Sequence, residues 1–108
     1  MANMTSLVQI VREFSKQADV YHPTRSPHTI LGSAMSELGE TAIEINIEAG
    51  QSYKTPGPDG VVGEALDTIL CLLDLIYRQN PNLKEEELVS LAVAKGSKWI
   101  EKISKDMP

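Results

Sequence analysis

The chain has 108 residues, of which 42% are hydrophobic, and it carries a formal net charge of −5 at pH 7. This length fits a single domain, residues 1–108, with a modest core, and the apolar fraction argues against a disordered chain. The sequence contains no basic run, so we expect no nucleic acid among its partners, because a phosphate backbone needs a basic face.

The single cysteine, Cys71, excludes an internal disulfide and a cysteine-rich zinc site. It lies in the most apolar stretch, where a free cysteine behaves as a small buried hydrophobe, and it fits a reducing cytoplasm. Residues 1–7 lack the basic start and apolar core of a signal peptide. The longest apolar run, residues 65–76, is too short to span a bilayer. We therefore expect a cytoplasmic protein with no membrane partner.

Apolar residues at helical spacing predict two helices in the first half of the chain. The first covers residues 5–18, with Thr5 or Ser6 as its N-cap. The second covers residues 29–49. Prolines within residues 22–28 predict a loop between the two helices.

Two further helices are predicted in the second half. The third covers residues 61–78 and is apolar nearly all round, which is typical of a helix central to a bundle. Asn82 and Glu85 resemble a capping pair at the start of a fourth helix that runs to residue 103. With no strand signal, we predict an all-α fold, a four-helix bundle. Such a small bundle is marginal as a monomer, so we expect a homo-oligomer that buries further apolar helix faces between chains.

Two pairs of carboxylates carry the clearest chemical signal, Glu37 with Glu40 and Glu64 with Asp67. Each pair lies in an apolar helical segment, and its three-residue spacing puts both members on one helical face. Carboxylates are costly to bury without a positive partner. Four such oxygen ligands indicate a divalent-metal site. Mg²⁺ is favoured and Mn²⁺ can substitute, because zinc would require histidine or cysteine.

A phosphorylated substrate at this metal needs positive groups beside its phosphates. The candidates for that role are Lys54, Arg78, Lys95 and Lys98. Tyr21 and His22 are candidates for contacting the base or sugar of a nucleotide, since such rings can stack on a base. Glu44 and Glu48 share the acidic arc of the second helix, and we expect them to be solvated or supporting, because exposed charge is the ordinary state of a helical glutamate.

The sequence Glu37-Leu38-Gly39-Glu40, followed later by Glu64-Ala65-Leu66-Asp67, resembles the ExxE…ExxD signature of MazG-like nucleotide pyrophosphohydrolases, members of the all-α NTP pyrophosphatase superfamily. The segment Tyr21-His22-Pro23 is similar to the approach to that family's first metal helix. The stretch from Lys95 to Trp99 is similar to its lysine-bearing C-terminal helix. The resemblance covers roughly residues 5–103.

The resemblance implies Mg²⁺-dependent hydrolysis of a nucleoside triphosphate between its α- and β-phosphates, giving a nucleoside monophosphate and pyrophosphate in a house-cleaning role. It implies Glu37, Glu40, Glu64 and Asp67 as metal ligands. Glu37 and Glu40 are the catalytic candidates, and one ligand, such as Glu40, would instead orient or deprotonate the attacking water. The resemblance also implies a dimer, or a tetramer built from dimers, with the site at a subunit contact.

The substrate and even the class of function have alternatives. The segment Tyr21-His22-Pro23 resembles that of dCTP-cleaving relatives and favours a deoxynucleotide such as dCTP or dATP, while dUTP and phosphoribosyl-ATP are alternatives within the superfamily. A different class is a non-catalytic helical module whose acidic stripe makes a dimer contact or a metal staple. Ser36 stands where many relatives carry a second Glu, and Trp99 and Lys102 stand where many carry Arg.

Overall fold

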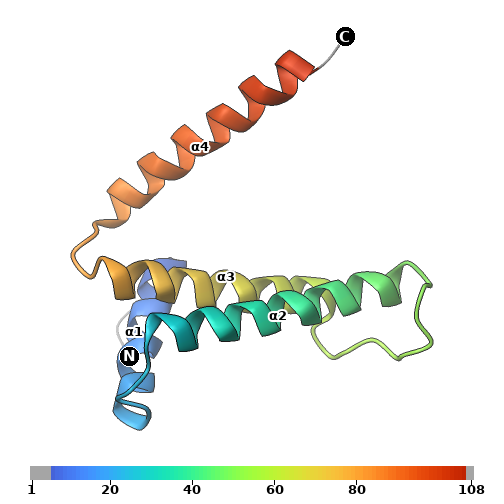
Figure 1. Cartoon of the computed structure of the whole chain (residues 1–108), viewed down its shortest axis with the longest axis horizontal. Coiled ribbons are helices and arrows are strands. Elements are labelled where there is room, and N and C mark those ends of the chain that lie inside the picture. The colour runs from blue at the N-terminus through green and yellow to red at the C-terminus, as the bar shows by residue number, and fades with distance from the viewer. Residues whose placement is uncertain (1–5, 107–108) are drawn as a thin grey trace.

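The computed structural model describes residues 6–106, which form four helices and no strand (Figure 1). The all-α class is therefore confirmed. None of the helices in this range is long and apolar enough to cross a membrane. The helices, in chain order, are α1 (Leu7–Tyr21), α2 (Pro27–Glu48), α3 (Gly60–Gln79) and α4 (Glu85–Asp106).

Local side-chain contacts set the ends of the first two helices. Ser6 is the N-cap of α1 and accepts a hydrogen bond from the Gln9 amide at 3.1 Å, whereas Thr5, the other candidate cap, lies outside the described residues. The helix runs to Tyr21, further than predicted, and ends just before Pro23, since the residue preceding a proline disfavours helical geometry. A capping box between Ser26 and Thr29 starts α2 two residues earlier than predicted.

The start of α4 differs from the predicted capping pair of Asn82 and Glu85. The Lys84 amide instead donates to the Glu87 side chain at 3.4 Å, and the Lys84 carbonyl accepts from the Leu88 amide at 3.1 Å. The first turn carries three glutamates, whose charge is favoured at a helix N-terminus. The cap is therefore two residues later than the sequence pattern indicated.

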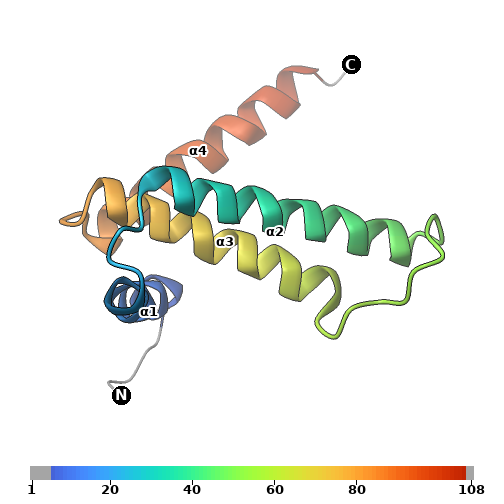
Figure 2. The same cartoon turned by 60° about the horizontal axis from the view of Figure 1, so that its bottom comes forward.

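The antiparallel pair of α2 and α3 forms the body of the chain (Figure 1 and Figure 2). A loop of residues 49–59 joins the two helices at one end, and α1 crosses the pair at the other end. A small apolar core fixes this crossing. Its buried members are Val8, Tyr77 and Leu83, with Leu73, Ile76 and Leu88 packed against them.

The helix α4 extends away from the other three helices (Figure 1). Near its start Leu88 packs against the core, but the apolar stripe beyond it is more than half exposed, at Val89, Val93, Trp99, Ile100 and Ile103. The predicted four-helix bundle therefore does not close within one chain. The link around Pro81 directs α4 away from α2 and α3, so its stripe finds no covering helix in the described part of the chain.

A network of charged side chains ties α1 and the loop after it to α3. Arg25 donates to the Ser15 carbonyl at 3.2 Å and to Asp19 Oδ1 at 3.1 Å, and it pairs with Asp74. The Ser15 hydroxyl donates to the second Asp74 oxygen at 2.6 Å. The side chains of Arg25 and Asp74 are only 16% and 15% exposed. Removing one partner would leave the other charge uncompensated in a largely dry environment.

We expect Arg25→Ala to lower the free energy of unfolding by about 3 kcal/mol, because it leaves the largely buried Asp74 carboxylate without its cation, whereas Asp19 keeps its pair with Arg78. The matched control is Lys105→Ala, which removes an exposed pair with Glu101 and should cost under about 0.5 kcal/mol. Urea unfolding followed by circular dichroism measures both. Equal small losses would show that the Arg25 network does not hold α1 to α3.

Candidate metal centre

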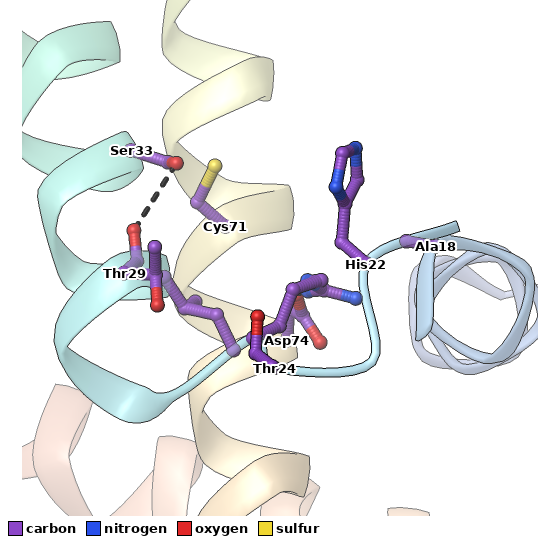
Figure 3. A pocket seen from close by; sticks show the side chains of 9 residues that line it. Ala18, His22, Thr24, Thr29, Ser33, Cys71 and Asp74 are labelled. Atoms are coloured by element: carbon purple, nitrogen blue, oxygen red, sulfur yellow. Dashed lines mark hydrogen bonds and ion pairs between the residues drawn. The ribbon is translucent and has the colours of Figure 1, made fainter. Parts of the chain in front are cut away.

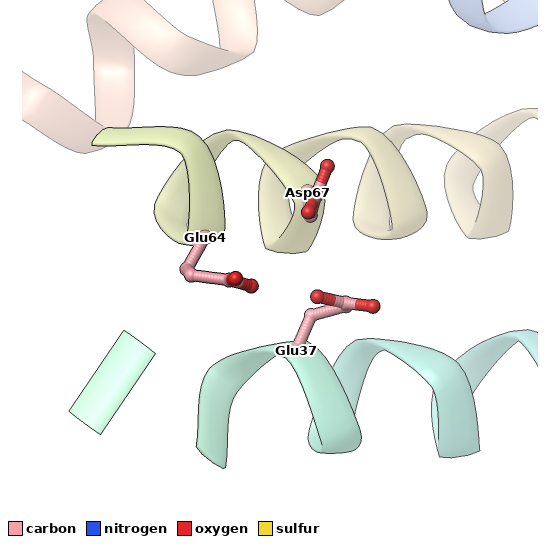
Figure 4. Close-up of side chains that lie close together, drawn as sticks. All are labelled: Glu37, Glu64 and Asp67. Atoms are coloured by element: carbon pink, nitrogen blue, oxygen red, sulfur yellow. The ribbon is translucent and has the colours of Figure 1, made fainter. Parts of the chain in front are cut away.

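Three of the four predicted carboxylates converge between α2 and α3 (Figure 4). Glu37 comes from α2, and Glu64 and Asp67 come from α3. Each offers one carboxylate oxygen, and these three oxygens all lie within 4.8 Å of one another. The convergence arises because each helix presents its acidic face to the other across the antiparallel pair.

The fourth predicted carboxylate, Glu40, lies outside this group of three. Its side chain is exposed on α2, one turn beyond Glu37. Its charge nevertheless contributes to raising the pKa of Glu64, so Glu40 lies at the edge of the same acidic site.

Crowding of like charges contributes to a raised pKa of Glu64. Its pKa is raised above the ordinary value of 4.5, first by loss of solvent around the carboxyl, then by a hydrogen bond with Glu37 and by the charges of Glu37, Asp67 and Glu40. A cation between these oxygens would relieve this repulsion. The donors are all carboxylates, which suits Mg²⁺ or Mn²⁺ rather than zinc, so the residues present fit the predicted metal.

A cavity of about 440 Å³ is lined by residues from α1, the loop that follows it, α2 and α3 (Figure 3). Ser33 and Cys71 line its near side, and each lies one helical turn, about 6 Å, from Glu37 and Asp67 respectively. The pKa of the Cys71 thiol is raised, chiefly by burial and then by the charges of Glu37, Asp74 and Asp67. The cavity therefore begins one helical turn from the carboxylates along both α2 and α3.

The two residues predicted to contact a base or sugar, Tyr21 and His22, have different surroundings in the structure. His22 lines the cavity, opposite α2 and α3 (Figure 3). Tyr21 does not line it, and its side chain is 78% exposed at the end of α1. Because α1 continues through Tyr21, the tyrosine points away on the helix surface while the next residue turns into the loop. Tyr21 is therefore not part of the candidate site.

The predicted phosphate-binding cations do not gather at the carboxylates within one chain. Arg78 donates to Asp19 Oδ1 at 2.5 Å and lies about 16 Å further along α3 than Asp67, so its role is to hold α1. Lys95 and Lys98 lie on α4, which extends away from α2 and α3. Lys54 is exposed in the loop between α2 and α3.

Glu44 is a residue whose place the sequence reading missed. It is buried, with 6% exposure, and its Oε1 accepts a hydrogen bond from the Gly57 amide at 2.8 Å. Glu44 was expected to be solvated or supporting; it is not solvated, because the α2–α3 loop folds back over it, and its contact with Gly57 supports that loop. The neighbouring Ile43 and Ile47, on an otherwise acidic side of α2, were the signal that this side is covered.

Arg25 is the second residue that sequence reasoning missed. It lines the cavity and holds Asp74, which also lines it. A carboxylate inside the apolar α3 needs a cation, and the sequence pattern does not identify Arg25 as that cation. The actual partner comes from a loop, where no periodicity marks it.

No protein-family model, curated protein or solved structure matches the chain. Any function assigned to the carboxylates must therefore come from their own chemistry and surroundings. That chemistry is an acidic, oxygen-only site beside a cavity of nucleotide-compatible size.

We expect Glu64→Gln to raise the melting temperature of the metal-free protein at about pH 7 and to change it little at about pH 4. The folded-state pKa of Glu64 lies above its unfolded value, so the stability it contributes is full below the unfolded pKa and is lost as pH rises through the folded pKa. Gln keeps the shape of the side chain and removes this loss.

Thermal melts in EDTA between about pH 4 and pH 8 measure this effect. Glu48→Gln, an exposed position on α2, is the control and should melt like the parent chain. A Glu64→Gln variant that melts lower than the parent at neutral pH without metal would contradict the crowding of these carboxylates.

Proposed function

We propose that this chain is a MazG-like nucleoside-triphosphate pyrophosphohydrolase. In this proposal it hydrolyses a (deoxy)nucleoside triphosphate, such as dCTP or dATP, between the α- and β-phosphates to a monophosphate and pyrophosphate. The reaction depends on Mg²⁺ and serves a cytoplasmic house-cleaning role. The observation that carries the proposal is the convergence of Glu37, Glu64 and Asp67, with oxygens within 4.8 Å, beside a cavity of about 440 Å³.

In this proposal, three of the carboxylates bind the metal and the fourth acts on the attacking water. Glu37, Glu64 and Asp67 hold the metal, and a bound Mg²⁺ supplies charge neutralisation on the phosphates. Glu40 is exposed at the edge of this group, where its carboxylate can accept a proton from a water that attacks phosphorus. General-base catalysis of this kind requires a carboxylate within hydrogen-bond reach of the water.

The cavity receives the nucleoside in this proposal. Ser33 and Cys71 face the sugar because they lie one turn from the metal ligands, and His22 lies on the opposite wall, where its ring can stack on the base. The volume falls in the usual range for small-molecule sites. Arg25 and Asp74 are largely fixed by their network and complete the far wall.

The positive charge for the phosphates comes from a second chain. The stripe of α4 beside Lys95 and Lys98 is apolar and exposed, and a helix with such a face is stabilised by packing on another helix. In a homo-oligomer, α4 of one chain would cover the α2–α3 pair of another and bring these lysines to its acidic site. This assembly is a dimer or a tetramer of dimers.

The purified chain should convert at least one deoxynucleoside triphosphate to monophosphate and pyrophosphate in the presence of Mg²⁺. Products from each dNTP, each NTP and dUTP are resolved by ion-exchange chromatography. EDTA and Glu37→Gln should each abolish turnover, because each removes the metal or one of its ligands, while Glu48→Gln should retain it.

Diphosphate and phosphate as products would overturn the cleavage position. Binding of Mg²⁺ with no turnover of any triphosphate would favour the non-catalytic module with a metal staple. Because Glu37→Gln relieves like-charge crowding, its fold should persist, and circular dichroism checks this.

Mixing two inactive variants should restore part of the activity if α4 acts across chains. One chain carries Glu37→Gln, and the other carries Lys95→Ala and Lys98→Ala. After co-refolding, mixed oligomers contain an intact acidic site facing an intact α4, so turnover should recover to about a quarter of the parent level by random pairing. No recovery in a confirmed mixed oligomer would place the lysines and carboxylates in unrelated sites.

A further inference from the structure

A cavity of about 220 Å³ lies between α1 and the last turn of α3, and we call it the cationic cavity. Arg12 and Lys16 line it from α1, and Arg78 lines it from α3. Asp19 is the one carboxylate among its described lining residues. The whole chain carries a net charge of −5, so this cavity gathers positive charge against the overall balance. Arg78 lies about 16 Å along α3 from Asp67, which separates the cationic cavity from the acidic site.

The negative charge at the cationic cavity is already paired. Asp19 Oδ1 accepts from Arg78 at 2.5 Å and from Arg25 at 3.1 Å. Arg12 and Lys16, in contrast, form no ion pair with a carboxylate among residues 6–106. Because they are four residues apart on α1, they are neighbours on one helical face, where like charges repel. The cavity therefore has two positive charges that no carboxylate of the described chain pairs with.

The guanidinium group of Arg12 is held at the cavity by two contacts. Its Nη2 donates to the Pro81 carbonyl at 3.0 Å, and its central carbon lies 4.8 Å from the centroid of the buried Tyr77 ring, where a cation is attracted to the aromatic face. Burial raises the pKa of Tyr77, the Arg12 charge opposes this shift, and three glutamates at the start of α4 add to it, but none of those glutamates lines the cavity. A guanidinium carries five N–H donors, so the bond to Pro81 leaves most of them available to a ligand.

We propose that the cationic cavity binds a small phosphate anion, orthophosphate or pyrophosphate, through Arg12, Lys16 and Arg78. The inference goes beyond the proposed function, because it uses none of the carboxylates of the metal centre. Planar guanidinium groups match phosphate oxygens with paired hydrogen bonds, and a lysine adds a compact positive charge. The volume is below the usual range of sites for larger ligands, which favours an inorganic phosphate over an entire nucleotide.

A phosphate bound in this cavity would bridge α1 to the end of α3. Arg12 and Lys16 lie on α1, Arg78 lies on α3, and the Pro81 carbonyl that Arg12 holds belongs to the link before α4. The anion would also relieve the repulsion between Arg12 and Lys16. A ligand that binds only the folded chain stabilises it by mass action, so phosphate should raise the melting temperature.

Calorimetric titration with orthophosphate and with pyrophosphate, in EDTA and without nucleotide, tests the inference. Arg12→Gln and Lys16→Gln should each weaken the binding seen with the parent chain by about tenfold or more, because each removes a charged hydrogen-bond donor. The control is Lys102→Gln, which removes the same charge from an exposed position on α4 and should bind like the parent chain. Amide NMR signals of residues 12–16 and 77–81 should shift during the titration.

Three results would overturn the inference. The first is no binding of either anion to the parent chain. The second is equal weakening in Lys102→Gln, which would mean attraction by net charge alone, and the third is amide shifts centred on the α2–α3 carboxylates instead. If Arg12→Gln fails to fold without its Pro81 contact, Lys16→Gln, at an exposed position, still decides. None of these measurements needs metal or turnover, so the proposed function stands or falls separately.

Discussion

The antiparallel pairing of α2 with α3 is the constraint on which the candidate site depends. Glu37 lies on one helix, and Glu64 and Asp67 lie on the other, so the three oxygens come within 4.8 Å only if the two helices keep their present register. A shift of one turn, about 5.4 Å, would separate them. Apolar contacts along the pair must therefore overcome the repulsion of the carboxylates that they bring together.

The same pairing explains why the remaining polar contacts take their present form. The Arg25 network fixes α1 and the cavity wall at one end of the pair, and the Glu44–Gly57 contact fixes the loop at the other. The acidic site lies between these two anchors. Each anchor uses a charged group that is mostly buried, and such groups specify geometry more than they add stability. The site is thus held from both ends by contacts that tolerate little displacement.

Much of this arrangement was predictable from residue patterns, and the failures have physical causes. Helical spacing identified all four helices, and the spacing of Glu37, Glu64 and Asp67 placed them on the faces that meet. The packing of α4 was not predictable, because an apolar stripe such as that of Val93 shows that a helix is covered but not by which chain.

The residues that the patterns missed depend on contacts distant in sequence. Glu44 is buried by a loop that returns to it from Gly57, and helical periodicity carries no information about where a loop lies. Arg25 reaches Asp74 from a segment with no regular spacing. Arg78, by contrast, was placed at the phosphates on charge alone, and the nearby Asp19 on α1 engages it instead. Charge identifies a candidate partner, but only tertiary packing decides between partners.

The loop between α2 and α3 has two halves with different mechanical freedom. From Gly57 onward the loop is fixed in place, because the Gly57 amide donates to Glu44. At the start of α3, Gly60 adopts a positive φ of 61°. Asp59 packs closely against Gly63 in the first turn of that helix. In the preceding half, the Gln51 amide donates to the Asn46 carbonyl of α2 at 2.9 Å, and beyond it the segment around exposed Tyr53 is held by a local contact, from the Lys54 amide to the Ser52 hydroxyl. Additional residues or a reporter group inserted near Tyr53 would therefore leave the helix register untouched, whereas lengthening the span between Gly57 and Gly60 would shift one row of carboxylates relative to the other.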